Sequence, residues 1–165
     1  MIKELLLIAG MAFVGLSACS QSKGSPAAAK TGKVEKTVDA DTAAGKVTFL
    51  TTAEFKKKVM DYDKNPDKWV FEGKKPAIID FFATWCGPCR QMSPIVEQIA
   101  KDNAGKIDVY KVDIDKEKQL ARVFGIQSIP TILFVPVAGK PTVQVGALDK
   151  ATFEQAVDEL LLSKP

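Results

Sequence analysis

Two cysteines separated by two residues are the feature of this sequence best suited to chemistry. Cys86 and Cys89 enclose Gly87 and Pro88, and Trp85 comes directly before them. The helical pattern that begins at Cys86 places it at a helix N-terminus, where unpaired N–H groups and the helix dipole stabilise a thiolate and lower the pKa of the thiol. We therefore expect Cys86 to attack disulfides, and Cys89, one turn further on, to resolve the mixed disulfide that forms.

Two other interpretations of the cysteine pair stay open. A pair with this spacing forms half of many zinc sites, but the chain has three cysteines and no histidine, so the other ligands would have to come from a second molecule. The second alternative is a structural disulfide, although so small a ring removes little entropy from the unfolded chain. The absence of histidine also excludes Ser-His-Asp and Cys-His catalysis and histidine-bound metals. We expect no bound metal.

The segments on either side of the pair predict the elements that position it. The apolar run 77–83, interrupted only by Asp80, is typical of a central strand covered on both faces. After Cys86, apolar residues at helical spacing predict a helix, which contains Pro94 and should bend there. This apolar stripe consists of Met92, Ile95, Val96 and Ile99.

The rest of this region alternates between predicted strands and helices. The sequence Thr-Thr-Ala-Glu at 51–54 fits a capping box, and Asp149 can cap a last helix. The buried stripe of that last helix is predicted to be Phe153, Val157, Leu160 and Leu161. Further strands are predicted at 47–50, 107–113, 131–135 and 142–145, and further helices at 51–60 and 116–124. Alternation followed by a hairpin favours the α/β class, with helices packed on a mixed sheet.

The N-terminal residues are typical of an export signal. The apolar run 5–16 would span about 18 Å as a helix, against about 30 Å of membrane hydrocarbon, which favours a secretory signal over a membrane span. Residues 16–19, Leu-Ser-Ala-Cys, resemble the lipobox of bacterial lipoproteins. Cleavage at a lipobox leaves a lipidated cysteine, here Cys19, as the first mature residue, and its acyl chains would anchor the protein to a membrane. The alternative is an ordinary or uncleaved signal with an incidental Cys19.

Composition divides the remaining chain in two. Residues 20–46 are mostly small and polar, cannot bury enough apolar surface to fold, and are expected to form a flexible tether. The predicted organisation is a signal at 1–18, the lipidated cysteine and tether at 19–46, and a folded domain at 47–165. The formal net charge of +3 comes mostly from the tether, so we expect no nucleic-acid partner.

Three segments, in this order along the chain, resemble the thioredoxin family. They are residues 77–89 around the cysteine pair, Gly-Ile-Gln-Ser-Ile-Pro-Thr at 125–131, and Val-Gly-Ala-Leu at 145–148. The resemblance implies a thioredoxin fold, in which helices flank a central mixed sheet. It also implies general dithiol–disulfide exchange on protein substrates without a bound cofactor, and we expect a monomer.

The resemblance also implies roles for residues near the cysteines. Cys86 resembles the attacking cysteine and Cys89 the resolving one. Asp80 matches the buried aspartate below the disulfide, and Lys111 matches the lysine that pairs with it. A carboxyl group in an apolar strand has a raised pKa and can pass a proton to and from the second thiol. The alternatives are a structural acid at Asp80 and a plain surface lysine at Lys111.

A substrate surface follows from the same resemblance. Pro130 matches a proline whose preceding peptide bond is cis and faces the disulfide. The backbone of Ile129 would then pair with an extended substrate segment, a form of strand addition. The expected docking patch consists of Trp85, Gly87, Pro88, Ile129, Gly146 and Ala147. Turn residues and ordinary core are the alternative interpretation, most of all for the last two.

The sequence also departs from the family pattern. Phe82 stands where many thioredoxins have a second tryptophan, which predicts a small change in packing. The segment 61–75, which contains Trp69, is longer than the usual connection to the central strand. It is either a partner contact or a decorated loop, and we favour the loop.

The direction of electron flow depends on how well the reduced thiolate is stabilised. Gly-Pro between the cysteines is typical of reducing thioredoxins, whereas oxidising relatives usually place a histidine there. With the export signal, this predicts a lipid-anchored reductase in the periplasm, by preference a Gram-negative one, which acts on disulfide-containing exported proteins. A membrane thiol transporter would supply its electrons. The alternatives are a disulfide oxidase or isomerase of the same fold, and a non-catalytic binding module or chaperone.

Overall fold

A mixed five-stranded sheet forms the centre of the computed structural model, which describes residues 45–163. The strand order is β1-β3-β2-β4-β5. The strands are β1 (Val47–Phe49), β2 (Ala77–Phe82), β3 (Asp108–Asp113), β4 (Thr131–Val135) and β5 (Thr142–Val145). The helices are α1 (Thr52–Lys58), α2 (Gly87–Asp102), α3 (Lys118–Val123) and α4 (Lys150–Val157), and a π-helical turn, η1 (Asp158–Leu162), continues α4. The predicted signal at 1–18, Cys19 and the tether as far as residue 44 lie outside the described residues.

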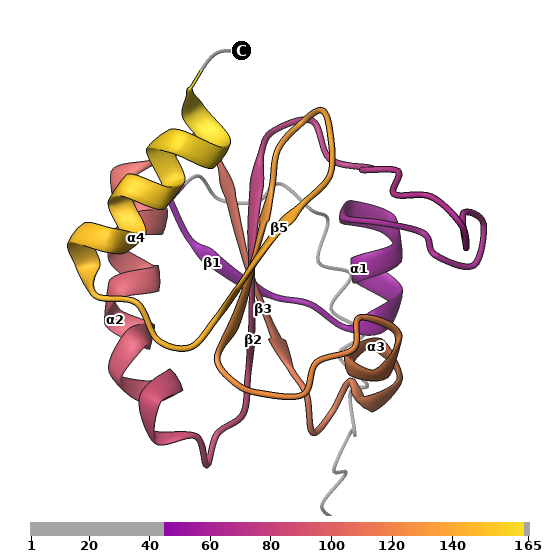
Figure 1. Cartoon of the computed structure of the whole chain (residues 1–165), viewed down its shortest axis with the longest axis horizontal. Coiled ribbons are helices and arrows are strands. Elements are labelled where there is room, and N and C mark those ends of the chain that lie inside the picture. Colours follow the sequence, from indigo (N-terminus) through magenta and orange to yellow (C-terminus); the bar gives the residue numbers. More distant parts are fainter. Residues whose placement is uncertain (1–44, 164–165) are drawn as a thin grey trace, which may run out of the picture. The chain divides into compact units, whose positions relative to one another are not determined.

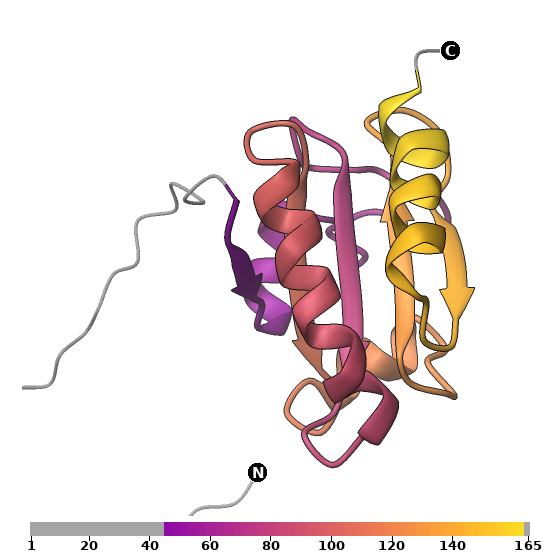
Figure 2. The ribbon, with the colours of Figure 1, turned by 90° about the vertical axis from the view of Figure 1, so that its left-hand side faces the viewer.

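The sheet places β2 at its centre. β1, β3 and β2 are parallel, whereas β4 runs antiparallel to β2 and β5 antiparallel to β4. In Figure 1 the sheet is seen edge-on, with α2 and α4 on one face and α1 and α3 on the other. Figure 2 shows α2 and α4 lying across their face of the sheet. The predicted class, an α/β fold with helices flanking a mixed sheet, is confirmed.

Alternate side chains of β2 enter two hydrophobic cores. Ile79 and Phe81 belong to the core beneath α1 and α3, with Phe55 and Leu120. Ile78 belongs to the core beneath α2 and α4. The second core also contains Met92, Val96, Ile99, Phe153 and Val157. Because both faces of β2 are covered, its sequence is an almost continuous apolar run rather than an alternating one.

All of the strands and helices predicted for residues 47–165 are present. The strands at 131–135 and 142–145 have the predicted bounds, and the others end within a residue or two of them. Thr51 caps α1, its side chain accepting from the N–H of Glu54 while the Glu54 carboxylate accepts from the N–H of Thr51. Asp149 caps α4 through the N–H of Thr152. Both caps confirm predictions made from short polar residues before an apolar stripe.

The prediction for the last turn of the chain is wrong at Leu160. Phe153, Val157 and Leu161 are buried as predicted, but Leu160 is exposed. The reason is the π-helical turn η1, in which the N–H of Ser163 donates to the carbonyl of Asp158, five residues back. A π-turn rotates each residue by less than an α-helix does, so Leu160 falls short of the buried face and Leu161 lands on it. Spacing counted at the α-helical period cannot show this.

The long segment between α1 and β2 is packed onto the core. Tyr62 is buried, and Trp69 and Phe71 are half-buried against the core beneath α1 and α3. The rings of Tyr62 and Trp69 both meet the edge or face of Phe124, at centroid distances of 6.2 and 6.3 Å. Trp69 therefore packs within the domain, which supports the interpretation of segment 61–75 as a loop rather than a partner contact. Within residues 45–163, no helix is long and apolar enough to cross a membrane.

Candidate active site

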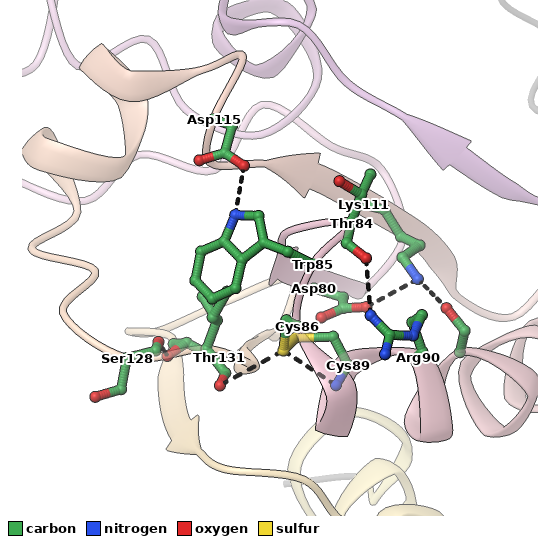
Figure 3. Close-up of a disulfide and its surroundings, with 12 residues drawn as sticks. Asp80, Thr84, Trp85, Cys86, Cys89, Arg90, Lys111, Asp115, Ser128 and Thr131 are labelled. Carbon is green, nitrogen blue, oxygen red and sulfur yellow. Dashed lines mark hydrogen bonds and ion pairs between the residues drawn. A yellow bond between two sulfur atoms is a disulfide. The ribbon is translucent and has the colours of Figure 1, made fainter.

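Cys86 and Cys89 form a disulfide at the start of α2 (Figure 3). The S–S distance is 2.02 Å and the Cα–Cα distance is 5.3 Å. Cys86 is the N-cap of α2, and the N–H of Cys89 donates to its Sγ at 3.1 Å. This donor is one of the N–H groups left free at any helix N-terminus. When the pair is reduced, the same group and the helix dipole stabilise a thiolate on Cys86.

Asp80 lies on the face of β2 that α2 covers, and its carboxylate is fully buried. Neither of its oxygens accepts a hydrogen bond from the described part of the chain. The Nζ of Lys111 lies 3.3 Å from Oδ2, close enough to form an ion pair. Burial raises the pKa of Asp80, and the nearby Lys111 opposes this only in part. A carboxyl group that is readily protonated is suited to exchanging a proton with a nearby thiol.

Lys111 is paired with Asp80 in the register of β2 and β3. Its side chain is 6% exposed, so it is no plain surface lysine. Figure 3 shows its Nζ directed toward the Asp80 carboxylate. The same Nζ donates to the Oγ of Ser93 at 2.5 Å and lies 4.6 Å above the ring centre of Phe82. The ring that replaces the second tryptophan therefore contacts the lysine ammonium group.

The loop before β4 faces the disulfide. The Ile129–Pro130 peptide bond is cis, and the Sγ of Cys86 lies 3.8 Å from the carbonyl oxygen of Ile129. The N–H of Gly146 donates to the carbonyl of Pro130 at 2.8 Å, which joins the loop after β5 to this site. Gly146 has a φ of +96°, a backbone conformation that favours glycine.

A shallow cleft of about 310 Å³ lies beside the disulfide. It is lined by Trp85, Ile114, Ile126, Gln127, Ser128 and Ile129. Of the residues predicted to form the docking patch, Trp85, Pro88 and Ala147 are exposed, and Gly87, Ile129 and Gly146 are half-buried. Trp85 is 65% exposed, yet its Nε1 donates to Oδ2 of Asp115 at 2.8 Å (Figure 3). An exposed indole held in one orientation is a suitable platform for an apolar substrate side chain.

Comparison with known proteins gives the family. Residues 46–159 match the family described as Thioredoxin. The chain belongs to the thioredoxin family. It is similar to a thioredoxin of Borreliella burgdorferi, at 52% identity over 110 residues that make up 67% of this chain and 93% of that protein. It is also similar to Thioredoxin 1 of Nostoc sp., at 39% identity over 112 residues, or 68% of this chain and 94% of that protein.

Two chloroplast proteins extend the comparison. The M-type thioredoxin of Pisum sativum is 39% identical over 99 residues, which are 60% of this chain and 58% of that protein. The crystal structure of chloroplastic thioredoxin z has a TM-score of 0.59 at 28% identity, covering 70% of this chain and 94% of that chain. The thioredoxin fold is therefore confirmed. Like its thioredoxin relatives, the chain is a thiol–disulfide oxidoreductase, and Cys86 and Cys89 are its cysteine pair.

Two residues of this thioredoxin site were missed by reasoning from the sequence. Ser93 lies four residues after Cys89 on α2, so both project from the same side of the helix. That spacing could have identified it, but the hydrogen bond to Lys111 depends on the packing of α2 over β3. Asp115 follows β3 and accepts a hydrogen bond from Trp85, thirty residues earlier in the chain. No pattern in the sequence predicts this contact. In residues 45–163, no group of three Cys, Asp or Glu side chains could hold a metal ion.

Proposed function

We propose that this oxidoreductase is a protein-disulfide reductase that works outside the cytoplasm, anchored to a membrane by lipid on Cys19. The single observation that supports reduction of substrates, rather than their oxidation, is the dipeptide between the cysteines. It is Gly87-Pro88, and the chain has no histidine that could stabilise the Cys86 thiolate further. A less stabilised thiolate gives a lower reduction potential, so the dithiol form is the stronger reductant.

The geometry supports a two-step reduction. In the dithiol form, the Cys86 thiolate attacks one sulfur of the substrate disulfide, and the other substrate sulfur leaves as a thiolate. The Asp80 carboxylate takes the proton of the Cys89 thiol, and the Cys89 thiolate attacks the Sγ of Cys86. The second substrate thiolate then leaves. Two electrons have passed to the substrate, and the protein holds the Cys86–Cys89 disulfide seen here.

The substrate side of this reaction fits the surface around the disulfide. The backbone of Ile129 lies next to Cys86 and borders the cleft beside Trp85. An extended substrate segment could add to the chain at Ile129, with an apolar side chain against the indole. We propose that the substrates are disulfide-containing exported proteins, that a membrane thiol protein returns the electrons, and that the compartment is a Gram-negative periplasm.

The reduction potential of the cysteine pair is the direct test of direction. We expect a value near about −270 mV, as in reducing thioredoxins, when the protein is equilibrated with dithiothreitol and followed by tryptophan fluorescence. A value near about −120 mV would instead make the protein a strong oxidant that introduces disulfides into its clients. The difference corresponds to about 7 kcal/mol for two electrons, so the two outcomes are well separated. A pair that neither oxidises nor reduces in this range would indicate a non-catalytic binding module.

The membrane anchor has a separate test. The motif Leu-Ser-Ala-Cys at 16–19 supports lipid attachment to Cys19, and several acyl chains hold a protein firmly in a bilayer. We expect the wild-type protein to incorporate labelled palmitate and to fractionate with membranes. Cys19→Ser should lose both properties and keep its rate of insulin reduction.

A matched cysteine variant makes this result specific. Cys89→Ser removes a different cysteine and should still incorporate palmitate and remain in the membrane fraction. The anchor proposal fails if wild-type protein carries no label, or if Cys19→Ser remains bound to membranes.

A further inference from the structure

Lys111 lies between two oxygen partners on different elements. Across the sheet, its register neighbours are Phe49 on β1 and Asp80 on β2. Its Nζ is 3.3 Å from Asp80 Oδ2 but 2.5 Å from the Oγ of Ser93. The nearer contact is a hydrogen bond, whereas both Asp80 oxygens lack one. The ammonium group is therefore hydrogen-bonded to the α2 hydroxyl, whereas its contact with the carboxylate is an ion pair without a hydrogen bond.

An aromatic ring and two surface grooves lie next to Lys111. The ring of Phe82 covers the ammonium group at 4.6 Å, and Phe82 meets Phe49 edge-on at 5.8 Å. A surface groove of about 310 Å³ is lined by Ser93 and Lys111 and also by Lys46, Glu97 and Lys101. A second groove of about 230 Å³ is lined by Lys111 and also by Asp113, Lys116 and Glu117.

The sheet register places one side chain from each neighbouring strand beside Asp80. β3 contributes Lys111, and β4 contributes Ile132, which is opposite Asp80 in the antiparallel register. Among the described residues that line these grooves, Lys111 is the one that forms an ion pair with Asp80, so it is the cation that sets the charge balance there. A full hydrogen-bonded ion pair would stabilise the carboxylate much more than the present contact does.

We propose that Ser93 is a positioning residue of the active site, which draws the Lys111 ammonium group away from full pairing with Asp80 and so keeps Asp80 able to accept the Cys89 proton and hold it. The inference rests on the proposed proton transfer between Cys89 and Asp80. Ser93 acts through Lys111, to which its hydroxyl is hydrogen-bonded. Without its hydroxyl, the flexible lysine side chain is free to turn its ammonium group onto the Asp80 oxygens.

Ser93→Ala is the variant that tests this inference, and Ser93→Thr is its matched control because threonine keeps the hydroxyl. The first measurement is the titration of the Asp80 carboxyl carbon by NMR in the oxidised full-length protein. In Ser93→Ala we expect the midpoint to move down by about one pH unit, which corresponds to one hydrogen bond gained by a charged group. Ser93→Thr should titrate like the wild type.

The second measurement is the pH profile of insulin reduction, which should move in the same direction as the carboxyl titration. Gln98→Ala changes an exposed residue on the same helix and controls for altered helix stability. It should leave the Asp80 titration midpoint and the pH profile of insulin reduction unchanged. The inference is overturned if Ser93→Ala titrates at the wild-type midpoint or above it, or if Ser93→Thr shifts as far as Ser93→Ala. A wild-type protein that does not reduce insulin would instead count against the proposed function. In that case the NMR titration would still decide the position of the Lys111 ammonium group.

Discussion

Cys86→Ser is expected to abolish disulfide reduction, with a fall in rate to background, about a thousandfold or more. The nucleophile in disulfide exchange is a thiolate, and a serine hydroxyl is almost never ionised near neutral pH. The N–H of Cys89 and the end of α2 stabilise an anion at position 86, but they cannot supply a sulfur that forms the mixed disulfide. The assay is turbidity of insulin reduced by dithiothreitol in the presence of catalytic protein.

Cys89→Ser is expected to block the second step, the resolution of the mixed disulfide. Its Cys86 still attacks substrate, so the first disulfide bond forms, but no neighbouring thiolate resolves it. Covalent complexes that disappear on treatment with excess reductant should accumulate on non-reducing gels. Cys86→Ser should form none, and Cys19→Ser should reduce insulin normally and serves as the cysteine control. Reduction of insulin by Cys86→Ser would overturn the assignment of the attacking residue.

The parts of the fold that follow local rules were predictable from the sequence. The strand at 131–135 is apolar after Thr131, because both of its faces are covered, and the cap at Thr51 has its own short signature. The disulfide pair is also local, since only two residues separate its cysteines at a strand–helix junction. For these features, neighbouring residues carry the whole signal.

The features that sequence reasoning missed depend on how elements pack. Leu160 is exposed because the helix widens in its last turn, and nothing in the pattern of leucines distinguishes a π-turn from an α-helix. Ser93 became part of the site only when α2 was placed over β3, and the burial of Trp69 required the position of Phe124. The contacts of Ser93 and Trp69 join segments far apart in the chain, whereas the exposure of Leu160 follows from a local change of helix type. The cysteines, and through the family resemblance Asp80, Lys111 and Pro130, could be named from the sequence, whereas Ser93 and Asp115 join the site only through the fold.

Asp80→Asn is expected to stabilise the protein at neutral pH by about 1–3 kcal/mol, because a neutral amide costs less to bury without hydrogen bonds than a charged carboxylate does. Burial raises the pKa of Asp80 above that of an aspartate in the unfolded chain, about 3.9. As pH rises from that value to the folded pKa, the unfolded chain loses a proton that the folded protein keeps. The unfolded state then binds fewer protons, so the free energy of unfolding falls through this window and stays lower above it.

Asparagine removes this pH dependence because it has no proton to lose. The two proteins should therefore have nearly equal stability at about pH 4 and diverge as the pH rises toward 7. Lys111 loses its ion pair in the variant, but it keeps the Ser93 hydroxyl and the ring of Phe82. Urea unfolding of the oxidised protein at several pH values measures the difference. Asp67→Asn, which changes an exposed aspartate, should show no such divergence.

Asp80→Asn should also slow disulfide exchange, although it stabilises the fold. An amide cannot accept the Cys89 proton, so resolution of the mixed disulfide should slow by about a hundredfold at neutral pH, the lower range for loss of a general base. The slowing should lessen as the pH rises and hydroxide deprotonates the thiol directly. A variant that gains stability but resolves mixed disulfides at the wild-type rate would show that Asp80 is a structural acid and no part of the proton transfer. A variant that loses both stability and rate would show that the Lys111 ion pair outweighs the burial of the carboxylate.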